Sequence, residues 1–152
     1  MTLLLHSDGS PFAIGANQFI SSLPIRPELF RIIVDIEVDG LPISAVVDTG
    51  APYLICAPEL AEALELRPAL AVGTDRLIIR GRKLTGRLYR LPVKFPALRG
   101  ESLTIDATVF VPQLLPDDSW DFPNFIGLTG VLERMRFAVD PESELFYFGP
   151  AN

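Results

Sequence analysis

The most informative stretch of the sequence is Ile43-Ser44-Ala45-Val46-Val47-Asp48-Thr49-Gly50-Ala51. An apolar strand leads into the stretch and stops at Asp48, so we expect this carboxylate to lie where the strand ends, in partial burial. Burial disfavours the charged form of a carboxyl, and a lone negative charge is therefore costly there. Thr49 can hydrogen-bond to nearby backbone, and Gly50 permits a turn and the close approach of another backbone segment.

The residues before this turn predict a β-hairpin over 30–47. Apolar side chains fall at every second position, which is the period of a β-strand, at Phe30, Ile32, Val34, Ile36 and Val38. Asp39-Gly40 follows, a strong signal for a tight turn between two apolar runs. Residues 42–47 then form the returning strand, which delivers the chain to Asp48.

The rest of the chain predicts a mainly β fold. Further strands are expected in a hairpin over 76–94, over 103–111, and in a last hairpin with strands 136–139 and 144–148. Helical signals predict one helix over 58–66, which follows the turn at residues 48–51 (the Asp48 turn), and a short C-terminal helix over 128–135. The 14 prolines favour short strands joined by turns over long helices.

The length of 152 residues allows one domain with its own hydrophobic core. Residues 1–28 contain glycines and prolines without sustained periodicity, which predicts an N-terminal arm that is either loose or paired with a partner chain. The domain proper is expected over residues 29–152.

Composition and charge exclude some classes of function. The formal net charge is −6, which disfavours non-specific binding to nucleic acid or to an anionic membrane. The first residues lack the basic region of a signal peptide, and no apolar run approaches the roughly 20 residues of a membrane helix. We therefore expect a soluble, cytoplasmic protein with neither a nucleic-acid nor a membrane partner.

Other chemically active side chains do not predict a site. His6 lies in the arm, and no Ser-His-Asp or Cys-His arrangement can be built around it. Cys56 is the only cysteine, which excludes an internal disulfide, and its apolar neighbours predict a buried, inert thiol. Three acidic residues, Asp117, Asp118 and Asp121, lack the spacing of a calcium loop. We expect neither a metal nor a cofactor.

The Asp48 turn suits peptide hydrolysis by a pair of carboxylates. Two aspartates a few ångströms apart do not both ionise easily, so they share one proton. The ionised member takes a proton from a water held between them, and the protonated member polarises the scissile carbonyl. This chemistry needs no metal and no nucleophilic side chain.

Three segments, in the same order, resemble the retropepsin-like aspartic proteases in the form found in bacteria. They are 43–51, Phe125-Ile126-Gly127 and 132–140. With the hairpin over 30–47, the resemblance covers roughly residues 30–149. It implies an acid-protease β-barrel, closed or partly open, in which Asp48 is the catalytic aspartate.

The resemblance also implies roles for neighbouring residues. Thr49, Gly50 and Ala51 would support the catalytic loop, and Ile126 with Gly127 would pack beside it. The family closes a hairpin flap over bound peptide. Candidate flap residues are Gly81, Arg82, Lys83, Leu84, Thr85 and Gly86. The basic residues of this segment indicate either a substrate with acidic neighbours or an ordinary solvated hairpin.

The number of catalytic loops predicts the assembly. Asp-Thr-Gly occurs once, whereas a single-chain enzyme of the pepsin type needs two such loops. We therefore expect a homodimer that hydrolyses polypeptides as an aspartic endopeptidase, with Asp48 of each chain meeting on a two-fold axis. Two alternatives stay open. One is a catalytically inactive module of the same fold that binds peptides or dimerises. The other is an unrelated β-barrel in which Asp-Thr-Gly is only a turn, far from Phe125-Ile126-Gly127.

Overall fold

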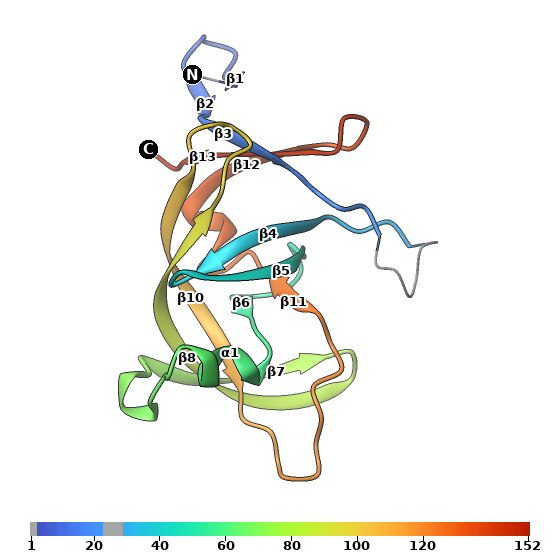
Figure 1. Cartoon of the computed structure of the whole chain (residues 1–152), viewed down its shortest axis with the longest axis vertical. Coiled ribbons are helices and arrows are strands. Elements are labelled where there is room, and N and C mark those ends of the chain that lie inside the picture. Colours follow the sequence, from blue (N-terminus) through green and yellow to red (C-terminus); the bar gives the residue numbers. More distant parts are fainter. Residues whose placement is uncertain (1–2, 23–28) are drawn as a thin grey trace.

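Figure 1 shows the computed structural model of the chain, which describes residues 3–22 and 29–152. The strands are β1 (Leu4–Leu5), β2 (Pro11–Ala13), β3 (Gly15–Gln18), β4 (Ile33–Val38), β5 (Leu41–Val47), β6 (Leu54–Ile55), β7 (Gly73–Ile79), β8 (Arg82–Phe95), β9 (Arg99–Gly100), β10 (Leu103–Pro112), β11 (Asn124–Ile126), β12 (Met135–Asp140) and β13 (Leu145–Pro150). The helical segments are α1 (Pro58–Ala63) and two 3-10 turns, Pro68–Leu70 and Leu132–Arg134. The predicted mainly β fold is confirmed. In the described part of the chain, no helix has the length and apolar character needed to cross a membrane.

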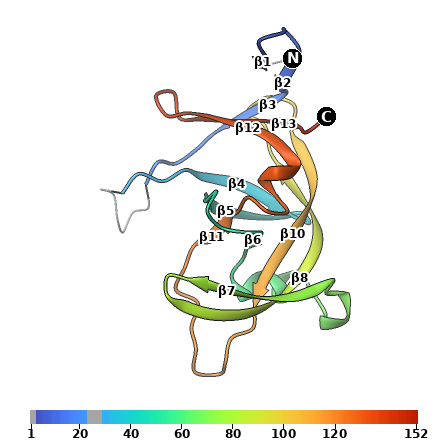
Figure 2. The ribbon, with the colours of Figure 1, turned by 180° about the vertical axis from the view of Figure 1, so that it is seen from behind.

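The largest sheet brings the strands around the Asp48 turn side by side. Its order is β10-β6-β11-β5-β4-β8-β7, and β10 pairs in addition with β8, so the sheet curls back on itself. Figure 2 shows β8 and β10 running together along one side of the molecule. β4 and β5 form the predicted hairpin, and Asp39 and Gly40 at its turn have positive φ angles of 48° and 88°. Two positive φ angles are typical of the type I′ turn that matches the twist of a hairpin.

A second sheet joins the two ends of the described chain. Its order is β12-β13-β3-β9, so β3 lies between the C-terminal hairpin and β9. The expectation of a loose or partner-bound arm is therefore wrong for residues 15–18, which pair within their own chain. Their pattern did not indicate a strand because its two buried residues, Gly15 and Ala16, are small. Residues 23–28, where the predicted arm ends, lie outside the described residues.

The predicted helices form only in part. The helix expected over 58–66 is shorter, because Glu65 adopts a positive φ of 54° that a helix does not allow. The short C-terminal helix expected over 128–135 forms only as a 3-10 turn, Leu132–Arg134. The N–H of Leu128 donates to the carbonyl of Ala51 at 2.7 Å, so the backbone there is held by a distant loop.

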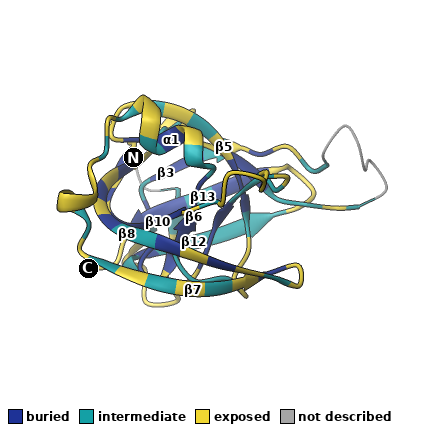
Figure 3. Cartoon of the chain, turned by 90° about the horizontal axis from the view of Figure 1, so that it is seen from below, coloured by how far each residue is buried: buried dark blue, intermediate teal, exposed yellow. Residues whose placement is uncertain are grey.

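The core is mainly aliphatic, and aromatic side chains from both sheets meet inside it. Phe95 on β8 contacts Phe146 and Phe148 on β13, with ring centroids 6.1 and 5.9 Å away. A smaller cluster, which includes Phe110 and Phe125, lies under the β7–β8 hairpin. Figure 3 shows the buried strands inside, while α1 and much of β7 are exposed. The Asp48 turn therefore lies beside the smaller cluster rather than in the main core.

Gly15 provides a test of the position of β3. A Cβ atom at this residue would overlap the carbonyl oxygen of Glu101 and the ring of Phe148. We expect Gly15→Ala to lower the free energy of unfolding by roughly 2 kcal/mol or more, measured by urea denaturation. Gln18→Ala, at the exposed end of the same strand, should change it by less than about 0.5 kcal/mol. Equal effects of the two substitutions would show that β3 is not packed in this position.

Candidate functional site

Backbone hydrogen bonds hold the Asp48 turn at the end of β5. The N–H of Asp48 donates to the carbonyl of Ile126 at 2.8 Å, and the N–H of Ala51 donates to the carbonyl of Asp48 at 3.1 Å. The N–H of Gly50 donates to Oδ1 of the Asp48 carboxylate at 3.0 Å, which orients that side chain. Asp48 is exposed in the single chain, so the expected partial burial is wrong there. Burial along β5 ends at Val46, and the turn bends out toward an open cavity.

The segment Phe125-Ile126-Gly127 packs directly against this turn. β11 lies parallel to β5 and antiparallel to β6, so it separates the strands that enter and leave the turn. A Cβ atom on Gly127 would lie only 2.5 Å from the carbonyl oxygens of both Ala51 and Tyr53. Only glycine permits this approach. The alternative in which Asp-Thr-Gly lies far from this segment is therefore wrong.

Thr49 contributes less to the single chain than its neighbours do. Its side chain is exposed, and within residues 3–22 and 29–152 its hydroxyl makes no hydrogen bond. Thr49 is also absent from the lining of the adjacent cavity, which includes Asp48, Gly50 and Ala51. The role across a dimer axis that the resemblance implies for Thr49 stays a prediction.

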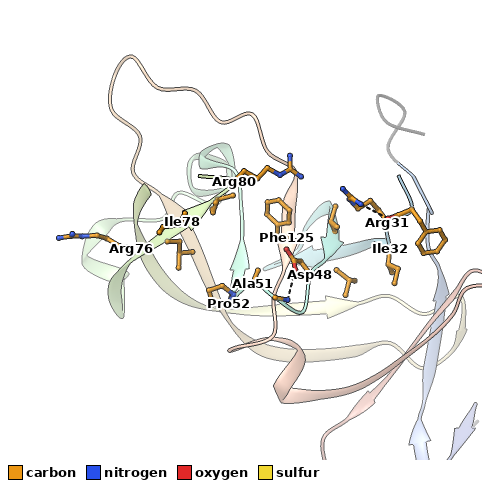
Figure 4. A pocket seen from close by; sticks show the side chains of 15 residues that line it. Arg31, Ile32, Asp48, Ala51, Pro52, Arg76, Ile78, Arg80 and Phe125 are labelled. Atoms are coloured by element: carbon orange, nitrogen blue, oxygen red, sulfur yellow. Dashed lines mark hydrogen bonds between the residues drawn. The ribbon is translucent and has the colours of Figure 1, made fainter. Parts of the chain in front are cut away.

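Asp48 faces a cavity of about 840 Å³. Its lining comes from residues 30–32, the Asp48 turn with the end of β5, residues 76–80 and Phe125 (Figure 4). Asp48 is the only carboxylate among these lining residues. In the described part of the chain, no group of three or more His, Cys, Asp or Glu residues could hold a metal ion. The carboxylate is therefore the one side chain of the lining that can act as a general base at neutral pH.

The hairpin over the cavity differs from the predicted flap in its turn. The turn is formed by Arg80 and Gly81, with positive φ angles of 48° and 84°. Of the candidate flap residues, only Gly81 is at the tip, and residues 82–86 belong to β8. The residues that line the cavity, 76–80, come from the other side of the turn. A two-residue turn ending in glycine was the sequence signal that could have located the tip.

Arginines fix the tip of the hairpin to the loop over 113–123, which joins β10 to β11. The Arg80 guanidinium lies over the rings of Phe122 and Phe125, 5.6 and 5.7 Å from their centroids. Arg82 also lies over Phe122, at 5.6 Å, and donates to the carbonyl of Ser119 at 2.8 Å. Its second nitrogen is 3.9 Å from the carboxylate of Asp118. These basic side chains are therefore bound within the chain and are not simply solvated.

A side-chain hydrogen bond connects the Asp48 turn to the base of the hairpin. The hydroxyl of Tyr53 donates to Oδ2 of Asp75 on β7 at 2.7 Å. This bond lowers the pKa of Asp75 and is the main reason that the pKa of Tyr53 is raised. Tyr53 has a positive φ of 60°, which is costly for a bulky residue, and its ring stacks on Phe110. No local sequence pattern predicts this contact, because the two residues lie on different elements.

The remaining candidates agree with inert roles. Cys56 is fully buried, and burial raises the pKa of its thiol, so the nucleophilic thiolate is disfavoured. The ring of His6 packs edge-on against Phe12, with centroids 5.2 Å apart. Trp120 packs on Phe122 at 5.1 Å and anchors the 113–123 loop.

Comparisons with known proteins point to one family. A family model described as aspartyl protease matches residues 34–112. Two curated relatives, both named DNA damage-inducible protein 1, are 33% identical to this chain over matched stretches of 84 and 86 residues. The match covers 51% of this chain and 20% of the relative from Candida glabrata, and 48% and 18% for the relative from Neurospora crassa. The chain thus spans about a fifth of the length of these relatives.

Among solved structures, a retropepsin-like aspartic protease from Rickettsia conorii has the same fold. The match covers 90% of this chain and 91% of that chain, with a TM-score of 0.59 and 19% sequence identity.

We expect Tyr53→Phe to lower the free energy of unfolding by about 1 kcal/mol near pH 7, because it removes the hydrogen bond to Asp75. The lowered pKa of Asp75 gives stability above the ordinary aspartate pKa of about 3.9, and this is lost as the pH falls through the folded value. The raised pKa of Tyr53 gives stability below about pH 10, which is lost as the pH rises through the folded value.

Urea denaturation of both proteins across pH should therefore give the largest difference between about pH 4 and 10. Tyr147→Phe is the matched control, since the Tyr147 hydroxyl makes no hydrogen bond with any described residue. A difference between wild type and Tyr53→Phe that is independent of pH would contradict the role of the Asp75 carboxylate.

Proposed function

The chain belongs to the aspartyl protease family, and on that premise we propose that it is an aspartic endopeptidase to which Asp48 supplies one catalytic carboxylate. One observation carries the proposal. The Asp48 carboxylate, oriented by the N–H of Gly50, faces a large cavity whose lining holds no other acid. The retropepsin-like fold, which the resemblance predicted, supports it.

A second copy of the chain would complete the site. Hydrolysis by paired carboxylates needs two acids within a few ångströms, and the cavity lining of one chain supplies only Asp48. The Asp48 carboxylate is exposed in the single chain and therefore accessible to a partner. A two-fold axis beside the turn would bring the same residue of both chains together, as in other isologous dimers.

The paired acids would then hydrolyse the peptide without forming a covalent bond between enzyme and substrate. The ionised carboxylate takes a proton from the water, and the water oxygen attacks the carbonyl carbon of the substrate. The protonated carboxyl donates its proton to the carbonyl oxygen, which forms a tetrahedral diol. The carboxyl that took the proton from the water then donates it to the amine nitrogen as the carbon–nitrogen bond breaks. The other carboxylate takes a proton from a hydroxyl of the diol, so the products are a carboxylic acid and an amine, and one proton is again shared by the pair.

The substrate would lie as an extended peptide between the Asp48 turn and β7. Within the described residues, β7 is at the end of the sheet, so one of its edges has no partner strand. Ile78 on this strand lines the cavity and is 71% exposed, which is unusual for a large apolar side chain in a monomer. A bound peptide could use this free edge and cover Ile78.

Substitution of the catalytic acid tests the activity. We expect Asp48→Asn to lower kcat/KM by at least about 1000-fold, because asparagine neither accepts nor shares the proton. Cleavage of a peptide library, followed by mass spectrometry, measures this loss. Asp39→Asn makes the same chemical change in the exposed β4–β5 turn and should retain full activity, since asparagine tolerates the positive φ at that residue. Full activity of Asp48→Asn would refute the assignment.

Mixing the two proteins tests the need for a dimer. When Asp48→Asn is mixed with wild type at equal amounts and allowed to exchange, about a quarter of the dimers contain two catalytic acids. The activity per wild-type chain should therefore fall to about half at constant total protein. Activity per wild-type chain that does not change, together with a monomeric mass in solution, would contradict the paired site. A monomer that binds peptides without cleaving them would instead favour the inactive module.

A further inference from the structure

The charge of the cavity is opposite to that of the whole chain. The chain has 13 basic and 19 acidic residues, a net charge of −6. The cavity lining contains three basic residues, Arg31, Arg76 and Arg80, and only one acid, Asp48. A concave site with low-dielectric walls concentrates the potential of its own charges, so an anionic group is attracted into the cavity and repelled by the acidic surface outside it.

The position of Arg80 makes it the main source of this charge. Its guanidinium is held over the rings of Phe122 and Phe125, and Phe125 also lines the cavity. This contact uses the face of the guanidinium and leaves its N–H donors free to bind a carboxylate. No carboxylate of the described residues lies within ion-pair distance of Arg80. Arg82, two residues later, is already bound to Asp118 and Ser119.

The opposite wall of the cavity carries a second guanidinium. Figure 4 shows Arg31 and Arg80 approaching the space in front of Asp48 from opposite sides, whereas Arg76 points away from it. Apolar residues, which include Ile78 and Phe125, also line the cavity. A lining that is both basic and apolar favours a peptide as the ligand, because an extended peptide presents both acidic and apolar side chains to such a surface. Nucleic acid requires a longer basic surface, and this acidic chain disfavours its approach.

We propose that the cleft selects extended peptides with an acidic side chain close to the scissile bond, and that Arg80 is the residue that binds this side chain, with Arg31 assisting from the opposite wall. The proposal rests on the proposed function for the location of the scissile bond. A guanidinium held in place by aromatic rings loses little conformational freedom when it binds a carboxylate, and the charge-assisted hydrogen bonds are stronger than those to an amide.

Two matched peptides test the proposal. Both are fluorescein-labelled hexapeptides with a central statine residue. The hydroxyl-bearing carbon of statine mimics the tetrahedral intermediate, and because it replaces the scissile carbonyl the peptide is not cleaved. One has glutamate on each side of the statine and the other has glutamine. We expect the glutamate peptide to bind wild-type protein about tenfold more tightly at low salt, measured by fluorescence anisotropy. The preference should decrease as salt is added.

Substitutions of two basic residues on the same hairpin identify the source of the preference. Arg80→Gln should reduce the ratio of the two affinities to less than about threefold. Lys83→Gln removes the same charge from an exposed residue outside the cavity lining and should leave the ratio unchanged. Equal binding of the two peptides, no binding of either, or an equal effect of the two substitutions would overturn the proposal. So would displacement of the glutamate peptide by an equal concentration of single-stranded oligothymidine.

The binding assay separates this inference from the proposed function. Preferential binding of the glutamate peptide by a wild-type protein that cleaves no peptide would support the acidic preference and refute the endopeptidase. Cleavage that Asp48→Asn abolishes, with equal binding of the two statine peptides, would support the endopeptidase and overturn the preference.

Discussion

Gly127 packs so closely on the backbone of the Asp48 turn that it holds the catalytic candidate in place. Two carbonyl oxygens, those of Ala51 and Tyr53, occupy the space that any side chain at residue 127 would need. The hydrogen bond from the N–H of Asp48 to Ile126 adds a fixed register between the end of β5 and the end of β11. A larger residue at 127 would separate these segments and move the carboxylate with them. The position of one acid is thus set by backbone contacts with a segment far along the chain, while the N–H of Gly50 orients its carboxylate.

The same turn is connected to the hairpin that forms the opposite wall of the cavity. At the base of the hairpin, Tyr53 binds Asp75, and at its tip Arg80 and Arg82 rest on Phe122. The strand between these two attachments exposes apolar surface to the cavity. Along its length, β7 pairs with β8. The fold therefore combines a floor fixed by backbone packing, which carries the acid, with a wall formed by the β7–β8 hairpin.

Local patterns were sufficient for part of the fold. The hairpin over 30–47 was predictable because its alternation and its Asp39-Gly40 turn are both local signals. The mainly β class followed from the same patterns. β3 was missed because its buried residues are small. The helix expected over 128–135 forms only as a short 3-10 turn, because a hydrogen bond from Leu128 to the Asp48 turn redirects the backbone. The tip of the second hairpin was placed too late, although Arg80-Gly81, a two-residue turn that ends in glycine, is a local signal for its position.

By itself, the sequence determined the carboxylate of the candidate site, the turn that carries it and, through the resemblance, the Ile126-Gly127 segment beside it. These are encoded in short motifs whose residue types are required by backbone geometry. The surroundings of Asp48 became visible in the folded chain: its exposure, the contact of Tyr53 with Asp75, and Arg31 and Arg80, which approach the cavity from opposite sides (Figure 4). These features depend on side chains from strands that are distant in sequence, and no local pattern specifies which of them meet.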